Sequence, residues 1–328
     1  MLTRRSVLRG AAGAAVAAPA ISTGLFAETK YPTQNIHAIC GFPPGTGADI
    51  FVRWYGKMLE DRLGRAVVVE NRLGAFGNIA TEHVARAKPD GHTIMIGPGN
   101  SLLAAAPSLF KKLSFDPMND FEHVTTLSKL PFLLIVSGDS PYKTAADLIA
   151  HLKAKGDKES YASVSNTGLV SSELLKANFG LKTVEVKYRD SSTMRNDLWA
   201  GHVAFVHSDP ASSLALRQAG RMRALATSSR ERFAAMPDIP SAAEVGIANS
   251  DVMSWWSVHV PKGTPAPIVD RLEAEFNDIV RSEEHRRFLA SSGSDPFLGN
   301  REVLRDTLAR ELKAWPDYVK IARIEPQG

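Results

Sequence analysis

The sequence predicts an α/β fold with two mainly parallel sheets covered by helices. Short apolar segments alternate with segments of helical spacing, first over residues 35–96 and again over 145–227. This alternation is typical of parallel strands that are joined by helical crossovers. Turns rich in glycine and hydroxyl groups follow several of the expected strands, and the 328 residues are enough for two domains.

The first series of elements contains three strands and two helices. In the helix expected over 48–62, apolar side chains recur on one face and charged side chains lie between them. The helix expected over 78–87 ends at a Pro-Asp-Gly turn. The strands expected in this series are 35–40, 66–70 and 93–96.

The second series is longer and is followed by a late strand and three helices. Its expected elements are a strand over 129–136, a helix over 145–155, a strand over 161–164, a helix over 171–179, a strand over 183–188, a helix over 192–200, and strands over 202–206 and 222–227. The late strand covers 254–260, and the closing helices cover 267–281, 284–291 and 301–323. Periodicity leaves two connections open: two domains in series, or a chain that crosses to a second domain and returns.

Residues 1–27 have the layout of a bacterial export signal. Arg4 and Arg5 precede a weakly apolar, alanine-rich run over 10–20, and paired arginines indicate the twin-arginine route. The apolar run is shorter than the roughly 20 residues that a membrane-spanning helix needs. We expect cleavage after Ala27, with Ala20 as the alternative, and a mature protein located in the periplasm.

The charge of the mature chain argues against a polyanionic partner. Removing residues 1–27 takes away three arginines and no acidic residue, so the formal charge falls from +4 to about +1. Nucleic acid and anionic membranes are therefore not expected as partners. The single cysteine, Cys40, lies in a strand-like run and is expected to be a buried apolar thiol without a disulfide partner in the chain.

Three strand-to-helix corners are the candidate binding elements. The first, Phe42 to Asp49, combines glycines with a helix start, where unpaired N–H groups and the helix dipole attract a carboxylate or phosphate. A tight turn capped by Thr46 or Asp49 is the alternative interpretation. The glycine spacing matches neither a P-loop nor a dinucleotide-binding fingerprint.

The other two corners have the same character. The segment Ser163 to Gly168 includes Ser165, Asn166 and Thr167, and helix capping explains one of these residues but not all of them. The segment 97–101 ends with Asn100 and Ser101. Because the carboxyl ends of parallel strands meet at one edge of a sheet, these corners predict a ligand cleft. Two segments that end later strands are expected to project toward the same space: Tyr188, Arg189 and Asp190, and the run 207–210 that contains Asp209.

Catalytic and metal-binding patterns are not found in the sequence. It contains no Gly-x-Ser-x-Gly elbow, no His-Glu-x-x-His and no Cys/His spacing for zinc, so no catalytic residue, metal or cofactor is expected. Trp255 and Trp256 are interpreted as core residues or as contacts at a hinge. Several other polar residues are expected to be solvated: His83, His123, His151, His285, Glu273, Glu275, Glu283 and Glu284.

An ordered set of segments carries a resemblance to a known family. The set comprises 41–49, 67–72 with Gly74 and 77–79, 88–93, 107–110 with 115–117, 161–163, 220–226, 236–240, and Trp256 followed by 261–265. In these segments the chain resembles the extracytoplasmic solute receptors of the tripartite tricarboxylate transporters, also known as Bug or TctC-like proteins. The likeness covers essentially the whole mature chain.

The resemblance implies a type II periplasmic-binding-protein fold, with two α/β lobes joined by two crossing hinge strands. It places one lobe over 28–128 plus 253–328 and the other over 129–252. It also implies a small organic acid held between the lobes by backbone N–H groups and water, and integral-membrane permease subunits as partners. The ligand-binding residues expected from the corners and the resemblance together are Phe42, Pro44, Gly45, Thr46, Gly47, Ala48, Asp49, Asn100, Ser101, Ser165, Asn166, Thr167, Gly168, Tyr188, Arg189, Asp190 and Asp209.

Two departures from the family pattern bear on the ligand. The family usually has Tyr-Lys-Gly or Tyr-Arg-Gly where this chain has Asp190 in the third position, and often a histidine where Ser172 and Glu173 stand. A carboxylate near an anion site disfavours a polyanion. We therefore expect a monocarboxylate, or an acid that also carries an amino or hydroxyl donor for Asp190.

Two other functions fit parts of the pattern. One is an exported hydrolase of small esters or amides with an unrecognised Ser/His/Asp set. The other is the effector lobe of a transcription regulator, which shares the fold. The second requires an N-terminal helix-turn-helix, where this chain has an export signal instead.

Overall fold

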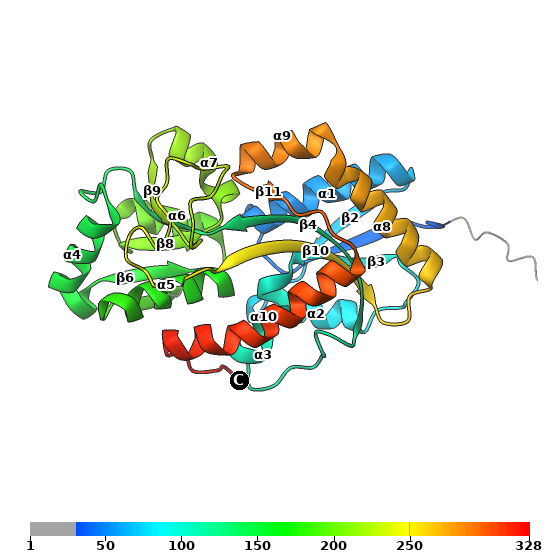
Figure 1. The fold of residues 1–328 in the computed structure, drawn as a ribbon, viewed down its shortest axis with the longest axis horizontal. Coiled ribbons are helices and arrows are strands. Elements are labelled where there is room, and N and C mark those ends of the chain that lie inside the picture. The colour runs from blue at the N-terminus through cyan, green and yellow to red at the C-terminus, as the bar shows by residue number, and fades with distance from the viewer. Residues whose placement is uncertain (1–30, 249) are drawn as a thin grey trace, which may run out of the picture.

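Two separate sheets form the framework of the chain (Figure 1). The computed structural model describes residues 31–248 and 250–328, so the predicted export signal lies outside the described residues. The six-stranded sheet has the order β11-β4-β10-β3-β1-β2 and the five-stranded sheet the order β7-β6-β8-β5-β9. We call the part of the chain built on the six-stranded sheet the first lobe, and the part built on the five-stranded sheet the second lobe.

The strands of the first lobe are β1 (Ile36–Cys40), β2 (Val67–Asn71), β3 (Thr93–Pro98), β4 (Phe121–Pro131), β10 (Met253–Pro261) and β11 (Asp295–Pro296). Those of the second lobe are β5 (Leu133–Ser137), β6 (Ser160–Ser163), β7 (Val184–Lys187), β8 (Phe205–Ser208) and β9 (Met222–Thr227). Strand β1 is parallel to β2 and β3, and β6 is parallel to β7 and β8. Strands β10 and β5 are antiparallel to their neighbours, so each sheet is mixed and the expectation of mainly parallel sheets is wrong.

The antiparallel strands are those that carry the chain between the lobes. Strand β4 ends at Pro131 in the first sheet and β5 begins at Leu133 in the second, with Phe132 between them. The return runs from β9 to β10, and residues 228–248 and 250–252 between them form neither a helix nor a strand. The chain thus crosses to the second lobe and comes back, which is the second of the two connections predicted. The strand expected over 129–136 is in fact the junction of two strands, because the chain changes sheets at Phe132.

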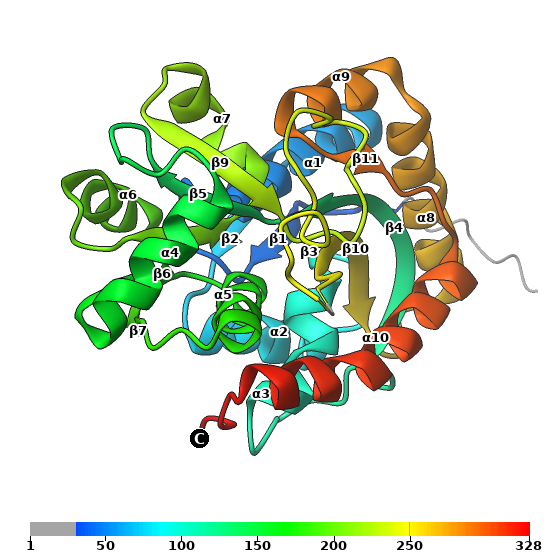
Figure 2. The same ribbon diagram turned by 60° about the vertical axis from the view of Figure 1, so that its left-hand side comes forward.

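Helices cover both sheets (Figures 1 and 2). In the first lobe they are α1 (Gly47–Leu63), α2 (Asn78–Ala85), α3 (Ala106–Leu109), α8 (Ala266–Arg281), α9 (Glu283–Ser292) and α10 (Arg301–Ala322). In the second lobe they are α4 (Ala145–Lys155), α5 (Asn166–Phe179), α6 (Ser191–Ala200) and α7 (Pro210–Gln218). None of the helices within the described residues has the length and apolar character needed to cross a membrane.

Three of these helices differ from the sequence prediction. Helix α5 begins at Asn166 rather than 171, because Ser165 caps it and Asn166, Thr167 and Gly168 form its first turn. Helices α3 and α7 were not predicted. Helix α7 begins with Asp209 as N-cap and Pro210 in the first turn, and both residues favour a helix start.

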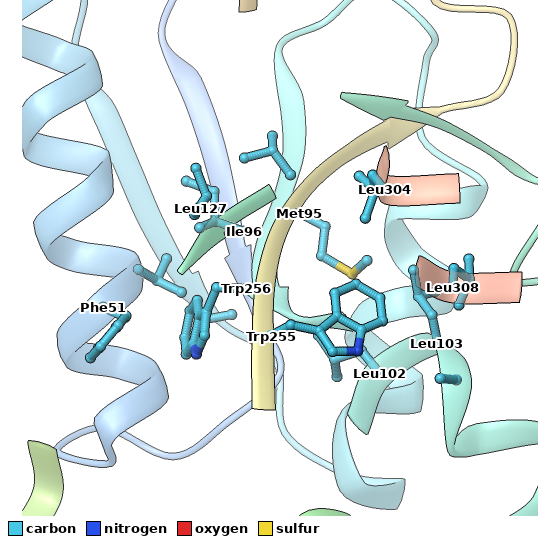
Figure 3. Close-up of a cluster of buried hydrophobic side chains, with 14 of the residues drawn as sticks. Phe51, Met95, Ile96, Leu102, Leu103, Leu127, Trp255, Trp256, Leu304 and Leu308 are labelled. Carbon is cyan, nitrogen blue, oxygen red and sulfur yellow. The ribbon is translucent and has the colours of Figure 1, made fainter. Parts of the chain in front are cut away.

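The core of the first lobe is organised on the two faces of β10 (Figure 3). Successive side chains of a strand point to opposite faces, so Trp256 packs on Phe51 of α1 while Trp255 faces the opposite side. Both indole rings are buried, which confirms their prediction as core residues. Cys40 is also buried, as predicted, and burial raises the pKa of its thiol to about 12.

Of the four histidines predicted to be solvated, two are buried and two are partly exposed. His123 and His285 are buried, whereas His83 and His151 are partly exposed. His285 lies 2.9 Å from the Tyr55 hydroxyl through Nε2 and 3.1 Å from the Val280 carbonyl through Nδ1. Such partners satisfy a neutral imidazole inside a core, which explains why a dispersed histidine need not be at the surface.

The prediction for Glu275 is likewise wrong. Its side chain is buried on α8, where its carboxylate lies 2.5 Å from Arg62 Nε and 2.7 Å from Arg271 Nη2. Buried carboxylates are found with such pairing because an unpaired charge would be costly. The other three glutamates are partly or fully exposed.

The buried histidines predict a loss of stability in mild acid. Burial lowers the pKa of His123 and His285 to about 4 and that of His207 to about 3. The unfolded chain takes up protons near pH 6.5 and the folded chain does not, so the free energy of unfolding should fall as the pH drops from 6.5 to 4.5. Each such histidine contributes roughly 2–3 kcal/mol to this fall. Urea unfolding at a series of pH values measures it.

Two substitutions test whether the pH dependence of stability comes from buried histidines or from histidines in general. His285→Gln keeps a donor for Val280 and an acceptor for Tyr55, and should make the fall between pH 6.5 and 4.5 smaller. His202→Gln should leave it unchanged, because the His202 side chain is 70% exposed. Equal pH dependence in the wild type and His285→Gln would contradict the prediction.

Candidate ligand-binding site

A narrow cavity of about 40 Å³ lies where the two lobes meet. Both lobes contribute to it, and its walls combine hydroxyl groups with large apolar side chains. Its lining residues are Phe42, Thr46, Gly47, Ala48, Phe51, Pro98, Ser101, Leu130, Phe132, Val164, Ser165, Thr167, Ser191, Ser208, Asp209, Ser254 and Trp256. The cavity therefore lies at the edge of the sheets where the predicted corners were expected to meet.

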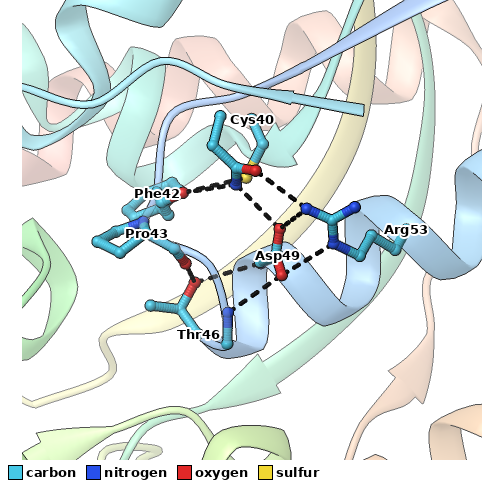
Figure 4. A network of polar contacts seen from close by, with 8 residues as sticks. Cys40, Phe42, Pro43, Thr46, Asp49 and Arg53 are labelled. Atoms are coloured by element: carbon cyan, nitrogen blue, oxygen red, sulfur yellow. Dashed lines mark hydrogen bonds and ion pairs between the residues drawn. The ribbon is translucent and has the colours of Figure 1, made fainter. Parts of the chain in front are cut away.

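The first corner joins β1 to α1 and is held by its own side chains (Figure 4). Thr46 caps α1: its hydroxyl accepts from Asp49 N at 3.2 Å and donates to the Pro43 carbonyl at 2.7 Å. Asp49 accepts from Gly45 N at 3.1 Å and pairs with Arg53 at 2.9 Å. The capped turn, given above as the alternative, is therefore present, and Thr46 also lines the cavity.

Asp49 stabilises the loop through hydrogen bonds and does not line the cavity. Burial alone would raise the pKa of Asp49, but hydrogen bonds from Arg53 and Asn71 outweigh it and hold the pKa below its usual value. Asp49, Pro44 and Gly45 do not line the cavity. From this corner the residues that reach it are Phe42, Thr46, Gly47 and Ala48.

Asp209 reaches the same corner from the second lobe. It caps α7, where Oδ1 accepts from Ser212 N at 2.8 Å, and its carboxylate lies against the backbone of Gly47. A Cβ atom on residue 47 would overlap this carboxylate, so the contact needs glycine. Burial raises the pKa of Asp209, although the amides of Ser212 and Gly47 oppose the rise.

The second corner is the N-terminus of α5. Ser165 caps the helix by accepting from Gly168 N at 3.2 Å, and Ser165 and Thr167 line the cavity. Asn166 and Gly168 do not line it. A Cβ on residue 168 would lie 2.5 Å from the His207 carbonyl oxygen, so Gly168 is what allows α5 to start this close to β8.

Hydrogen bonds connect the second corner to the third. Asn100 begins a short π-helical turn over 100–104, and its Nδ2 donates to Thr167 Oγ1 across the lobes at 2.9 Å. Asn166 Nδ2 donates to the Ser101 carbonyl at 3.2 Å. Ser101 lines the cavity and is 1% exposed, and its hydroxyl has no hydrogen-bond partner within the described residues. Of this corner, Pro98 and Ser101 line the cavity, and the Asn100 side chain connects the two lobes.

The three residues that end β7 lie outside the cavity. Tyr188 and Arg189 border a separate surface hollow of about 540 Å³, which shares Phe42 and Val164 with the cavity wall. Asp190 caps α6, and its oxygens accept from Thr193 N at 2.7 Å and Thr193 Oγ1 at 2.8 Å. The geometry therefore removes the basis for pairing Asp190 with a ligand, since capping occupies its carboxylate. The next residue, Ser191, does line the cavity.

Six of the seventeen lining residues lie outside the segments predicted for the site: Phe51, Leu130, Phe132, Ser191, Ser254 and Trp256. Pro98, Val164 and Ser208 lie within the predicted segments 97–101, 163–168 and 207–210, although they were not named as ligand-binding residues. Phe51, Leu130 and Phe132 belong to apolar runs that indicate a core. The crossing between the lobes near Phe132 places such residues beside the cavity.

The cavity has an unusual charge pattern for a candidate anion site. Seven serines and threonines line it, and Asp209 is the one ionisable side chain among the lining residues. An anion bound here would depend on hydroxyls and on N–H groups at the starts of α1 and α5. In residues 31–248 and 250–328, no cluster of three or more His, Cys, Asp or Glu side chains is arranged to hold a metal ion.

Comparison with known proteins gives consistent results. The family described as tripartite tricarboxylate transporter family receptor, TctC, matches residues 51–322. The chain is 32% identical to a UPF0065 protein from the tcbD-tcbE intergenic region of Pseudomonas sp. strain P51, over 96% of this chain and 94% of that protein. It is 28% identical to BugT of Bordetella pertussis, over 94% and 95% of the two chains.

Solved structures agree with these relatives. R. palustris Rpa4515 with adipate has a TM-score of 0.85 and 29% identity, covering 90% of this chain and all of that one. The periplasmic binding protein BugD has a TM-score of 0.85 and 27% identity, with the same coverage. MatC from Rhodopseudomonas palustris with bound malate has a TM-score of 0.81 and 26% identity, covering 88% and 100% of the two chains. These likenesses confirm the predicted two-lobe fold.

The capped turn at the first corner predicts a stability difference between two substitutions of Thr46. Thr46→Val keeps the side-chain shape but removes the hydrogen bonds with Asp49 and Pro43, and should lower the free energy of unfolding by about 1–2 kcal/mol. Thr46→Ser keeps the cap and should lie close to the wild type. Urea unfolding at pH 7.5 distinguishes them, and equal stability of the valine and serine variants would refute the capping role.

Proposed function

The chain belongs to the tripartite tricarboxylate transporter receptor family of periplasmic solute-binding proteins, and on this premise we propose that it captures a small organic acid between its lobes. The bound acid is then delivered to the integral-membrane permease subunits of a tripartite transporter. The similar structures of Rpa4515 with adipate and of MatC with bound malate support an organic acid as the class of ligand.

The cavity supports this proposal through its neutral donors. The N-termini of α1 and α5 belong to different lobes and both border the cavity, so an acid between them would interact with both lobes. The observation that carries the proposal concerns Ser101, a residue that lines this space and whose buried hydroxyl has no partner within the described residues. Buried polar groups are rarely left without a partner, and a ligand carboxylate would supply one.

Function then follows from lobe movement. We propose lobes over 28–128 plus 253–328 and over 129–252, a division supported by the crossings near Phe132 and between β9 and β10. A ligand that contacts both lobes favours the closed arrangement. The permease then distinguishes the closed, ligand-bound receptor from the open one by its surface. Export and cleavage of residues 1–27 would place the mature receptor in the periplasm.

Binding is favoured over hydrolysis by the position of the serines and histidines. Two Ser–His pairs are in contact within the described residues: Ser257 Oγ lies 2.7 Å from His259 Nε2, and Ser172 Oγ lies 2.9 Å from His207 Nδ1. All four residues are buried, and a nucleophile buried in this way cannot reach a substrate. Among the lining residues, Ser165 caps a helix and Thr167 accepts from Asn100, so neither hydroxyl is paired with a histidine.

Two buried serines offer a matched test of the binding role. Ser101 and Ser137 both have hydroxyls without a partner in the described residues, but only Ser101 lines the cavity. Ser101→Ala should weaken binding of the acid roughly 10- to 100-fold, because a hydrogen bond to a charged group is worth about 1.5–3 kcal/mol. Ser137→Ala should leave affinity unchanged. Neither variant should lose stability, since each removes an unpaired buried hydroxyl.

The measurement is a thermal-shift screen of the mature protein with organic acids, followed by calorimetry on each acid that raises the midpoint. Failure of every acid to raise it would count against the proposed function. Equal affinity of the wild type and Ser101→Ala would count against this cavity as the binding site.

A further inference from the structure

Asp209 differs from every other lining residue in its charge, and we propose that it is a specificity-determining residue of this receptor. In this proposal Asp209 selects acids that carry one carboxylate and, at the far end, a hydroxyl or ammonium donor. It disfavours acids with a carboxylate at both ends. The inference rests on the proposed function and names the class of ligand for the same cavity.

The first step of the argument is that Asp209 occupies the N-terminus of α1. Its carboxylate lies against Gly47, where a Cβ would overlap it. Nearby amides of this corner are already engaged within the loop: Gly45 N donates to Asp49 and Thr46 N to the Pro43 carbonyl. The protein thus supplies its own anion at the position where the first corner would otherwise receive a ligand carboxylate.

The second step concerns the cost of a second anion at this corner. A ligand carboxylate here must either share the corner with Asp209 or displace it into the same enclosed cavity. Both outcomes bring two negative charges together without a lysine, arginine or histidine among the lining residues. Like charges in such surroundings disfavour each other's ionised form. A hydroxyl or ammonium group would instead donate to Asp209.

The third step identifies the opposite end as the carboxylate site. The N-terminus of α5, a helix of 14 residues, contributes Ser165 and Thr167 to the cavity. Ser101 lines the same cavity, and its buried hydroxyl has no partner within the described residues. A helix start and an unpaired donor suit a carboxylate. The cavity therefore has hydrogen-bond donors at the α5 end and the Asp209 carboxylate at the α1 end. This arrangement would orient a ligand that has a carboxylate at one end and a hydroxyl or ammonium group at the other.

The chain offers a variant and a matched control. Asp209→Asn removes the charge while keeping the size, and asparagine caps a helix as well as aspartate does, so α7 should remain intact. Asp190→Asn makes the same change at another N-cap of the same lobe, outside the cavity. Both variants change the net charge equally, so only a local effect can separate them.

The experiment is calorimetry at pH 7.5 with three matched series of three to six carbons: ω-hydroxy acids, ω-amino acids and α,ω-dicarboxylic acids, including succinate and adipate. The wild type should bind its best hydroxy or amino acid at least 10-fold more tightly than the dicarboxylate of equal length. Asp209→Asn should shift this ratio at least 10-fold toward the dicarboxylate. Asp190→Asn should keep the wild-type ratio.

Three results would overturn the inference. The first is a wild type that prefers succinate or adipate over the matched hydroxy and amino acids. The second is an affinity ratio that is unchanged in Asp209→Asn, or that changes equally in Asp190→Asn, while the proteins still bind acids. Either form of this second result would overturn the inference but not the proposed function. The third is the absence of binding by all three proteins in every series, which would count against the proposed function as well as the inference.

Discussion

The contact between the Asp209 carboxylate and the backbone of Gly47 sets how closely the two lobes approach. It joins the caps of two helices from different lobes, since Gly47 begins α1 and Asp209 precedes α7. Any side chain at residue 47 would hold the lobes apart. A second close approach at Gly168 brings the start of α5 onto β8 within the second lobe. Two glycines thus determine where helix N-termini face the cavity.

Other contacts reinforce this arrangement from the opposite side. The Asn100 side chain donates to Thr167 and accepts from Ser254 at 3.1 Å, so one buried amide connects β10, the turn over 100–104 and α5. Val170 and Leu174 of α5 also belong to the buried apolar cluster that contains Trp315 of α10. Figure 2 shows α10 passing close to α5. Polar and apolar contacts therefore act together where the lobes meet, and a hinge motion would have to break both.

The sequence was sufficient to predict what depends on local pattern. Helix α4 has the predicted bounds, and the capping residues Thr46 and Ser165 stand where the corners indicated. Burial of Cys40 also followed from its apolar strand. These features are determined by neighbours a few residues apart, which is why spacing and residue type identify them.

Features that depend on distant segments were predicted poorly. Strand β4 begins at Phe121, but its many polar residues prevent its first part from being recognised as a strand in the sequence. Its partners β10 and β11 lie more than a hundred residues away. His123 and His285 were expected in solvent because nothing local marks their partners, His259 and Tyr55. Asp190 and Asp209 illustrate the limit for the site. Both are N-caps that follow strands in the second lobe, and only the packing of α7 against α1 brings one of them to the cavity.

A cavity without basic side chains has a consequence for how selectivity can change. When a lysine or arginine binds an acid, its charge dominates and neighbouring groups adjust the affinity. In the proposed site, hydroxyls and backbone amides would hold the anion, and each would contribute modestly. A single carboxylate such as Asp209 then has a large relative effect, because no lining cation compensates it. The same backbone framework can therefore accept different acids through the exchange of one N-cap residue, since asparagine, serine and aspartate all preserve the helix start.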